Sequence, residues 1–168
     1  VWVAEQGQGI FDSAGQLLAL EGVIIDVTEL KRTEQAFGAS EADYRGIFET
    51  ALEGIFRTIP EGRLLAVNPA MARMHGYATP EEMIASVTDL ASQVYADPAD
   101  RRRILESLDR TGWVHNYEYQ ARRKDGQLIW VLLSGRTVTD HSGRLLYYQG
   151  TCLDITEHKH MAELQAAK

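Results

Sequence analysis

The sequence predicts an α+β domain built on a five-stranded antiparallel sheet with helices on one face, preceded by an N-terminal β-hairpin and a linker helix. Three observations lead to this fold class. From residue 54 the chain runs through two strands, several short helices and three strands. That order is typical of folds that segregate their helices to one side of a sheet. Gly, Pro and Asp residues mark the turns between the strands, and the last strands repeat the start of the chain.

An internal repeat organises the chain. Residues 129–159 align without a gap on residues 1–31, 128 positions earlier, with 12 identities in 31 positions. The identities gather on turn and helix-start residues, such as an Asp-x-x-Gly turn that begins at Asp12 and again at Asp140. Self-similarity at a fixed offset indicates a duplicated structural unit. We therefore expect residues 1–27 to be the closing hairpin of a preceding domain.

The hairpin itself is predicted from strands at 1–11 and 16–26, joined by a turn that suits Asp and Gly. Asp26 is expected to cap the helix that follows, with Glu29 completing a capping-box pattern. An isolated hairpin is marginal in water, and bare strand edges invite pairing. We therefore expect it to dock on another sheet, across a homodimer, or else to be mobile.

A helical linker is predicted over residues 28–43. Gly38 is expected to end one helix and Ser40 to cap the next. Apolar residues then recur at the spacing of an amphipathic helix, at Tyr44, Ile47, Phe48, Ala51 and Leu52. One alternative is a helix that docks on its own domain. The other is a linker that pairs with a second chain, because apolar residues also recur every seven positions, at Leu30, Phe37, Tyr44 and Ala51.

The main domain is expected over residues 44–157, with 158–168 beginning an output helix. Its strands are predicted at 54–59, 64–67, 113–123, 127–139 and 144–154. Three helices are expected to begin where a capping side chain precedes Pro at the first helical position, at Asn68, Thr79 and Asp97.

Composition excludes several classes of protein. The chain has 168 residues, 17 Lys and Arg against 24 Asp and Glu, and a net charge of −7. An acidic chain without a concentrated basic face is not expected to bind nucleic acid. No apolar stretch approaches the roughly 18 residues of a membrane span, so we expect a cytoplasmic protein. The single cysteine, Cys152, excludes an internal disulfide and a Cys-rich metal cage.

Several short segments occur in an order typical of one known family. They are Asn68-Pro69-Ala70-Met71 with Gly76-Tyr77, Arg123-Lys124-Asp125-Gly126 before Trp130, and Asp154-Ile155-Thr156-Glu157. Together with the order of elements, they resemble the PAS sensory domain with its C-terminal PAC strands, over roughly residues 41–157. Residues 1–31 resemble the last two strands of a preceding PAS domain.

The resemblance implies a signalling role. Such domains are usually sensory or relay modules in bacterial histidine kinases, diguanylate cyclases and related proteins, and they commonly dimerise. We accordingly expect a homodimer, an output domain on the same polypeptide, and a small-molecule ligand in a pocket between sheet and helices. Two rival readings stay open: a ligand-free dimerisation spacer, and a small α+β enzyme of unrelated type.

The expected signal junction is Asp154-Ile155-Thr156-Glu157, which joins the last strand to the output helix. If the carboxylate of Asp154 caps that helix, the position of the sheet is coupled to the direction of the helix. Loss of such a cap costs about 0.5–2 kcal/mol, which is comparable to the coupling energy of a two-state relay. The alternative is an ordinary cap that only stabilises the junction.

The sequence names no cofactor and argues against two. Relatives that bind haem place a His on the helix before the last three strands, and residues 98–110 contain none. Relatives that form a cysteinyl–flavin adduct carry Cys on a pocket helix, whereas Cys152 lies on the last strand. No metal-binding, phosphate-binding or nucleophile motif is present, so we expect no enzymatic activity.

Candidate pocket residues project from the helices and the sheet. They are Met71, Met74, Tyr77, Leu90, Ile104, Leu108, Tyr117, Ser134 and Arg136. By strand alternation, Ser134 and Arg136 share a face with Trp130 and Leu132. If that face is inward, Arg136 would favour an anionic ligand such as a carboxylate. If it is outward, Arg136 is solvated or pairs with the neighbouring strand.

Overall fold

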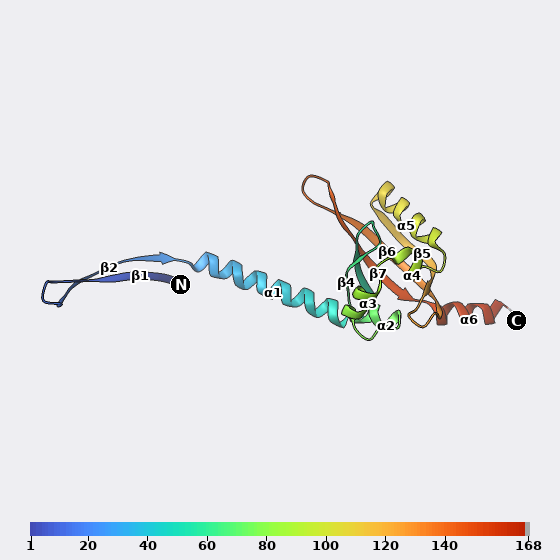
Figure 1. Ribbon diagram of the computed structural model, residues 1–168, viewed down its shortest axis with the longest axis horizontal. Coiled ribbons are helices and arrows are strands. Elements are labelled where there is room, and N and C mark those ends of the chain that lie inside the picture. Colours follow the sequence, from blue (N-terminus) through green and yellow to red (C-terminus); the bar gives the residue numbers. More distant parts are fainter. Residues whose placement is uncertain (167–168) are drawn as a thin grey trace. The chain divides into compact units, whose positions relative to one another are not determined.

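The computed structural model describes residues 1–166 and divides the chain into two compact units, Val1–Gly46 and a second that begins at Ile47. The elements follow one another as β1 (Val3–Phe11), β2 (Leu17–Asp26), α1 (Thr28–Thr50), β3 (Gly54–Thr58), β4 (Leu64–Val67), α2 (Pro69–Met74), α3 (Pro80–Ser86), α4 (Leu90–Gln93), α5 (Pro98–Thr111), β5 (Trp113–Arg122), β6 (Leu128–Thr139), β7 (Leu145–Asp154) and α6 (Thr156–Ala166) (Figure 1).

The first unit contains an antiparallel hairpin of β1 and β2, as the sequence predicts. The carboxylate of Asp12 holds the turn by accepting hydrogen bonds from the backbone N–H groups of Ala14 and Gln16, each at 2.8 Å. Gly15 completes the turn with φ +82°, a left-handed conformation that side chains disfavour. Asp26 then accepts from the N–H of Thr28 at 2.8 Å and caps α1.

Helix α1 is continuous from Thr28 to Thr50, so the expectation that Gly38 ends one helix and Ser40 caps another is wrong. A glycine within a helix costs about 1 kcal/mol relative to alanine, which neighbouring residues with good propensity offset. Pairs of charged side chains one turn apart add support. Examples are Lys31 with Glu34 and Arg45 with Glu41, each at 2.9 Å.

The second unit is built on a five-stranded sheet in the order β4-β3-β7-β6-β5, with every neighbouring pair antiparallel. Helices α2 to α5 lie against one face of this sheet (Figure 1). The predicted fold class is therefore confirmed. The closing strand in sequence, β7, lies at the centre of the sheet, and its residues 148–152 pair on both sides, with β3 and with β6.

Strand alternation separates a core face from an outer face. On β6, Ile129, Val131 and Leu133 are buried, whereas the residues between them are half-exposed. The helices complete the core with Met83 and other buried apolar residues. Alternating burial of this kind is typical of an antiparallel sheet covered on one side.

The sequence repeat is also a repeat of structure. Strands β1 and β2 pair in the register Val3↔Asp26, and β6 and β7 pair in the register Val131↔Asp154, 128 positions later. Both hairpins also shift register at the same place, between Ile10 and Phe11 and between Val138 and Thr139. The two hairpins are therefore built to one plan.

Asn68 ties β3, β4 and α2 together from a fully buried position. Its side-chain oxygen accepts from the N–H groups of Met71, at 2.9 Å, and Ile55, at 2.8 Å. Its amide nitrogen donates to the carbonyl of Glu53 at 2.9 Å. A helix cap and a strand pairing thus depend on one amide group.

We predict that Asn68→Ala lowers the free energy of unfolding by about 2–4 kcal/mol, because it removes a cap and leaves a buried N–H without a partner. Asp97→Ala is the matched control: Asp97 caps α5 from an exposed position, and its loss is expected to cost about 1 kcal/mol. Urea denaturation of the two variants measures the difference. Equal losses would contradict the role assigned to Asn68.

Candidate functional site

The junction between β7 and α6 is fixed by three side-chain hydrogen bonds. The carboxylate of Asp154 accepts from the N–H of Thr156 at 2.9 Å and from its hydroxyl at 2.6 Å. The same hydroxyl accepts from the N–H of Trp130, at the start of β6, at 2.9 Å. The backbone closes the arrangement, since the N–H of Ile155 donates to the carbonyl of Trp130 at 2.8 Å. The first turn of α6 is therefore bonded to the beginning of β6.

A second set of contacts holds α6 against the outer face of the sheet. Lys159 forms an ion pair with Glu118 of β5, and its ammonium group lies 5.1 Å from the centre of the Trp130 ring. The two charged side chains are 32% and 44% exposed, so solvent screens the pair and it contributes little to stability. Its effect is geometric, because it places the second turn of α6 over β5 and β6.

The N-terminal hairpin carries the same junction. The N–H of Trp2 donates to the hydroxyl of Thr28 at 2.9 Å, and the N–H of Val27 donates to the carbonyl of Trp2 at 3.0 Å. Asp26 accepts from the N–H of Thr28, and hydrogen bonding to Thr28 lowers the pKa of the Asp26 carboxyl. The chain therefore contains two strand-to-helix junctions of one design.

His75 lies buried at the end of α2, beside the junction between β7 and α6. Its Nδ1 donates to the carbonyl of Met71 at 3.1 Å, while its Nε2 has no hydrogen-bond partner among the described residues. Burial lowers the pKa of His75 below its usual value of 6.5. The nearby charge of Arg123 acts in the same direction, and that of Asp154 opposes it. The imidazole is therefore neutral at pH 7.

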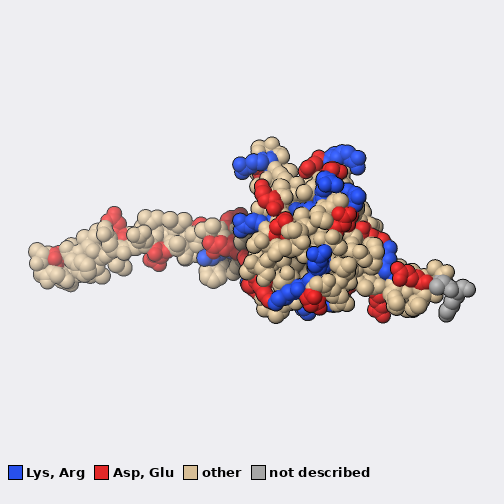
Figure 2. Space-filling view, turned by 45° about the vertical axis from the view of Figure 1, so that its right-hand side comes forward, with Lys and Arg blue, Asp and Glu red and all other residues tan. Residues whose placement is uncertain are grey.

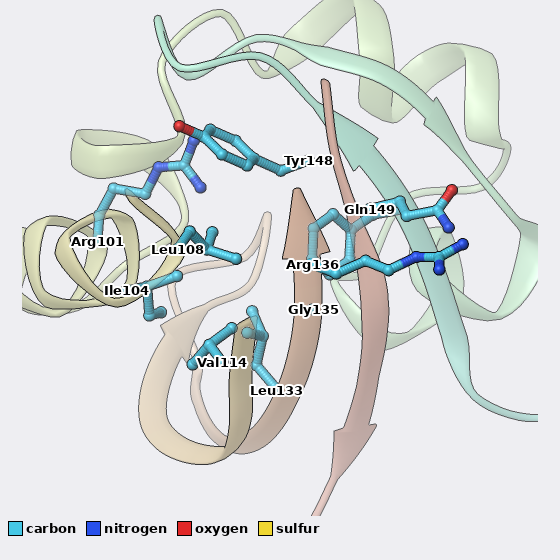
Figure 3. Close-up of a pocket in the computed structure, with 10 residues that line it drawn as sticks. Arg101, Ile104, Leu108, Val114, Leu133, Gly135, Arg136, Tyr148 and Gln149 are labelled. Atoms are coloured by element: carbon cyan, nitrogen blue, oxygen red, sulfur yellow. The ribbon is translucent and has the colours of Figure 1, made fainter. Parts of the chain in front are cut away.

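A small cavity lies between α5 and the sheet, where the sequence predicts a pocket (Figure 3). Its volume is about 10 Å³, roughly the space of one water molecule. Ile104 and Leu108 border it from the helix, and Leu133 borders it from β6. Arg101, only 5% exposed, lies at its edge and donates to the carbonyl of Ile59 at 3.2 Å.

Comparison with known proteins agrees with this architecture. Residues 52–157, which include all five strands of the sheet and helices α2 to α5, match the family described as PAS domain. The chain belongs to the PAS family. The PAS domain accordingly corresponds to the second unit, and the junction at Asp154–Thr156 is its C-terminal end.

Two curated relatives are signalling proteins. The sensor histidine kinase TmoS of Ectopseudomonas mendocina is 27% identical over 138 residues, which is 80% of this chain and 14% of that protein. The probable diguanylate cyclase DgcE of Escherichia coli K12 is 27% identical over 124 residues, 71% of this chain and 11% of that protein. The chain thus spans about a seventh or less of these relatives, in the manner of a signalling module.

Solved structures share the fold. A PAS domain from Colwellia psychrerythraea superposes with a TM-score of 0.59 at 17% identity, over 69% of this chain and 97% of that one. A domain of a sensory box histidine kinase/response regulator from Geobacter sulfurreducens gives 0.51 at 26% identity, over 68% of this chain and 94% of that one. No helix in the described range is long and apolar enough to cross a membrane.

The PAS fold gathers most of the predicted pocket residues into or against the core. Those buried in it are Met71, Leu90, Ile104 and Leu108, and those packed against it are Met74, Tyr77 and Tyr117. The hydroxyl of Tyr117 does not face a cavity but donates to Asp100 at 2.7 Å.

Ser134 and Arg136 lie on the outer face of the sheet. Arg136 is exposed and, like Gln149, points away from the cavity (Figure 3). The Gln149 amide, oriented to satisfy both groups, accepts from Nε and Nη2 of Arg136 at 3.0 and 2.8 Å. Ser134 accepts from the N–H of Asn116 at 3.0 Å. The structure therefore has the outward alternative for this strand face, with Arg136 paired to the neighbouring strand.

Sequence reasoning missed the most polar parts of the core. Arg101 was not among the expected core residues. It shares a helix face with Ile104 and Leu108 at spacings of three and seven, which is the signal that could have placed it inward. Tyr95 and Tyr119 stack in the interior with ring centres 4.5 Å apart. No local sequence pattern predicts this pair, because Tyr95 lies in the segment between α4 and α5 and Tyr119 lies on β5.

Cys152 lies in the same interior region, on β7, and is 1% exposed. Burial raises the pKa of its thiol to about 12, and burial likewise raises the pKa of Tyr95 to about 12. Both groups are therefore neutral at physiological pH. A protonated, enclosed thiol is a poor nucleophile. Within residues 1–166, no group of three His, Cys, Asp or Glu side chains is arranged to hold a metal ion.

We predict that His75 makes the stability of the PAS domain depend on pH below about 6.5, the usual pKa of an exposed imidazole. The unfolded chain takes up a proton at His75 near pH 6.5, while the folded domain does not because its pKa is lowered. The free energy of unfolding therefore falls as the pH is lowered, by up to about 1.4 kcal/mol per pH unit. Chemical denaturation at several pH values measures this slope.

His75→Gln is expected to flatten the slope, whatever its effect on stability at pH 7. His141→Gln, at an exposed turn position, is the control and should keep it. A slope that survives in His75→Gln would show that other groups carry the dependence.

Proposed function

We propose that the PAS domain is a non-enzymatic sensory and relay module, in which the Asp154–Thr156 junction passes a shift of the sheet to α6. The observation that carries this proposal is a pair of hydrogen bonds made by the backbone of Trp130. Its N–H donates to the Thr156 hydroxyl, and its carbonyl accepts from the N–H of Ile155. A shift of β6 must move the start of α6 or break these bonds. The same pattern at Trp2, Val27 and Thr28 supports a relay used twice in the polypeptide.

The junction also connects to the helical side of the fold. The carbonyl of His75 accepts from the N–H of Lys124 at 2.8 Å, which joins the end of α2 to the β5–β6 turn. Lys124 in turn forms an ion pair with Glu82 of α3. In this proposal a rearrangement of α2 or α3 acts on the β5–β6 turn through these contacts, and through the start of β6 it reaches Trp130 at the junction.

The input in this proposal is a change at the α5 side of the core. Its cavity of about 10 Å³ accepts a small molecule only if α5 or the Arg101 side chain moves. Such movement would pull on β6 through Leu133, which borders the cavity. Coupling of binding to strand position would then follow from the close packing of the core.

A second candidate function is a ligand-free dimerisation spacer. Two observations favour it: the small volume of the cavity, and the exposure of apolar side chains that recur every seven residues on α1, where Leu30 is 58% and Phe37 is 72% exposed. A seven-residue apolar repeat is the pattern with which helices pair. In this function the junction only stabilises the start of α6.

We predict that Thr156→Val in the longer natural polypeptide changes its output by about fivefold or more. The output is autophosphorylation for a histidine kinase or cyclic-di-GMP synthesis for a diguanylate cyclase, assayed according to the domain present. The valine matches threonine in shape but cannot accept from the N–H of Trp130 or donate to Asp154. Thr156→Ser keeps the hydroxyl and is expected to retain normal output.

Asp140→Ala is the matched control for loss of an Asp that caps backbone N–H groups. Asp140 accepts from Ser142 and Arg144 in the β6–β7 turn, away from the junction, and its replacement should leave output unchanged. If Thr156→Val folds normally and its output equals that of the natural protein, the relay is rejected and the spacer is favoured.

A further inference from the structure

The N-terminal hairpin exposes far more apolar surface than a solvated ribbon needs. Leu20 is 79% exposed, Ile24 is 68%, Val23 is 61% and Ile25 is 56%. Figure 2 shows few charged side chains over the hairpin of β1 and β2. Exposed apolar side chains in this number mark a ribbon that another part of a protein covers.

The repeat shows how the equivalent surface of the PAS domain is used. By the 128-residue offset, Leu20 corresponds to Tyr148 and Ile24 to Cys152, which are 3% and 1% exposed. Ile25 corresponds to Leu153, which stays 42% exposed on the outer face. The face of β2 that carries Leu20 and Ile24 is therefore built as a core face.

The free edge of β2 has a counterpart as well. In the PAS domain the edge of β7 that faces away from β6 pairs with β3, in the register Phe56↔Gly150 and Gly54↔Cys152. The corresponding positions on β2 are Gly22 and Ile24. Strand β2 pairs only with β1 within the described residues, so this edge lacks the partner that β7 has.

A pair of facing glycines marks where that partner fits. Gly22 lies opposite Gly7, and Gly150 lies opposite Gly135. A methyl group at Gly150 would come within 3.0 Å of the Phe56 ring, and one at Gly22 would come within 2.7 Å of the Gln6 carbonyl. The strands approach so closely that neither position admits a side chain.

The space beside these glycines is open in the N-terminal hairpin and filled in the PAS domain. A hollow of about 610 Å³ is lined by Gln6–Gln8 and Glu21–Val23. Three of the corresponding residues in the PAS domain, Gly135, Arg136 and Gln149, line a cavity of only about 10 Å³, which Phe56 of β3 and Ile104 and Leu108 of α5 also border. The hairpin thus presents a site for an aromatic side chain on an added strand.

We propose that β1 and β2 are the closing hairpin of a second domain of this fold, and that a segment of the same polypeptide N-terminal to Val1 covers them. That segment has the same order of strands and helices as residues 47–127. One of its strands pairs with the free edge of β2 and places an aromatic side chain over Gly22, and its helices cover the face of Leu20 and Ile24. Helix α1 is then both the output helix of that domain and the helix that enters the PAS domain.

The test uses Ile24 and Ile25, two adjacent residues whose side chains lie on opposite faces of β2. In the natural polypeptide extended upstream by a segment as long as 47–128, Ile24→Asp is expected to abolish the cooperative unfolding of the upstream unit or to lower its midpoint by about 10 °C or more. Ile25→Asp is expected to shift it by less than about 3 °C. Hydrogen exchange with mass spectrometry reads the two units separately, and the pair Cys152→Asp and Leu153→Asp calibrates the scale in the PAS domain.

A measurement on the unsubstituted chains keeps the test decisive if Ile24→Asp fails to fold. The amides of β2 that face away from β1 should exchange freely in residues 1–168 and become protected in the extended polypeptide. If they stay unprotected there, no upstream segment covers the edge. If Ile25→Asp is the more damaging substitution, the outer face is the one covered, as by a second copy of the chain, and the proposal is overturned.

Discussion

The structure depends on the closure of an antiparallel hairpin by a threonine that belongs to the following helix. The Thr156 hydroxyl serves two groups at once, accepting from the N–H of Trp130 and donating to the carboxylate of Asp154. Because β7 lies between β3 and β6, the end of this hairpin is also the end of the central strands. In the proposed relay, a change in the direction of α6 therefore requires a change in the sheet.

The core of the PAS domain combines apolar packing with a few enclosed polar groups. His75, Arg101 and Cys152 are each 5% exposed or less. Burial holds the imidazole and the thiol in their neutral forms, while the guanidinium of Arg101 donates a hydrogen bond to a backbone carbonyl. Such groups make a core sensitive to small displacements, because a buried polar atom that loses its partner is costly.

Local sequence patterns predicted the fold because the residues that begin each helix have a recognisable type and order. Asn68-Pro69, Thr79-Pro80 and Asp97-Pro98 each combine a cap with a proline at the first helical position, and the helices begin there. Gly38 misled because a glycine ends a helix only where the backbone turns left-handed, and α1 runs straight through it. Turn and cap chemistry is local, so a sequence can display it.

The site was less visible because it depends on distant pairs. The alternation of β6 groups Arg136 with Ser134 but does not show whether that face of the strand points inward or outward. Only the order of strands in the sheet shows that Arg136 lies on the outer face. The partnership of Trp130 with Thr156 joins residues 26 positions apart. The repeat places Trp2 and Thr28 at the same separation, and the structure shows that both pairs meet in the same geometry.

The most direct test of this account is the rate of hydrogen exchange at the backbone N–H of Trp130, measured by NMR on the 168-residue chain. We expect exchange at least about tenfold slower than in an unstructured peptide, unchanged in Thr156→Ser and released in Thr156→Val while the neighbouring amides of β6 stay protected. Free exchange of this amide in the natural sequence, or equal protection in Thr156→Val, would contradict the claim that the threonine ties the helix to the sheet.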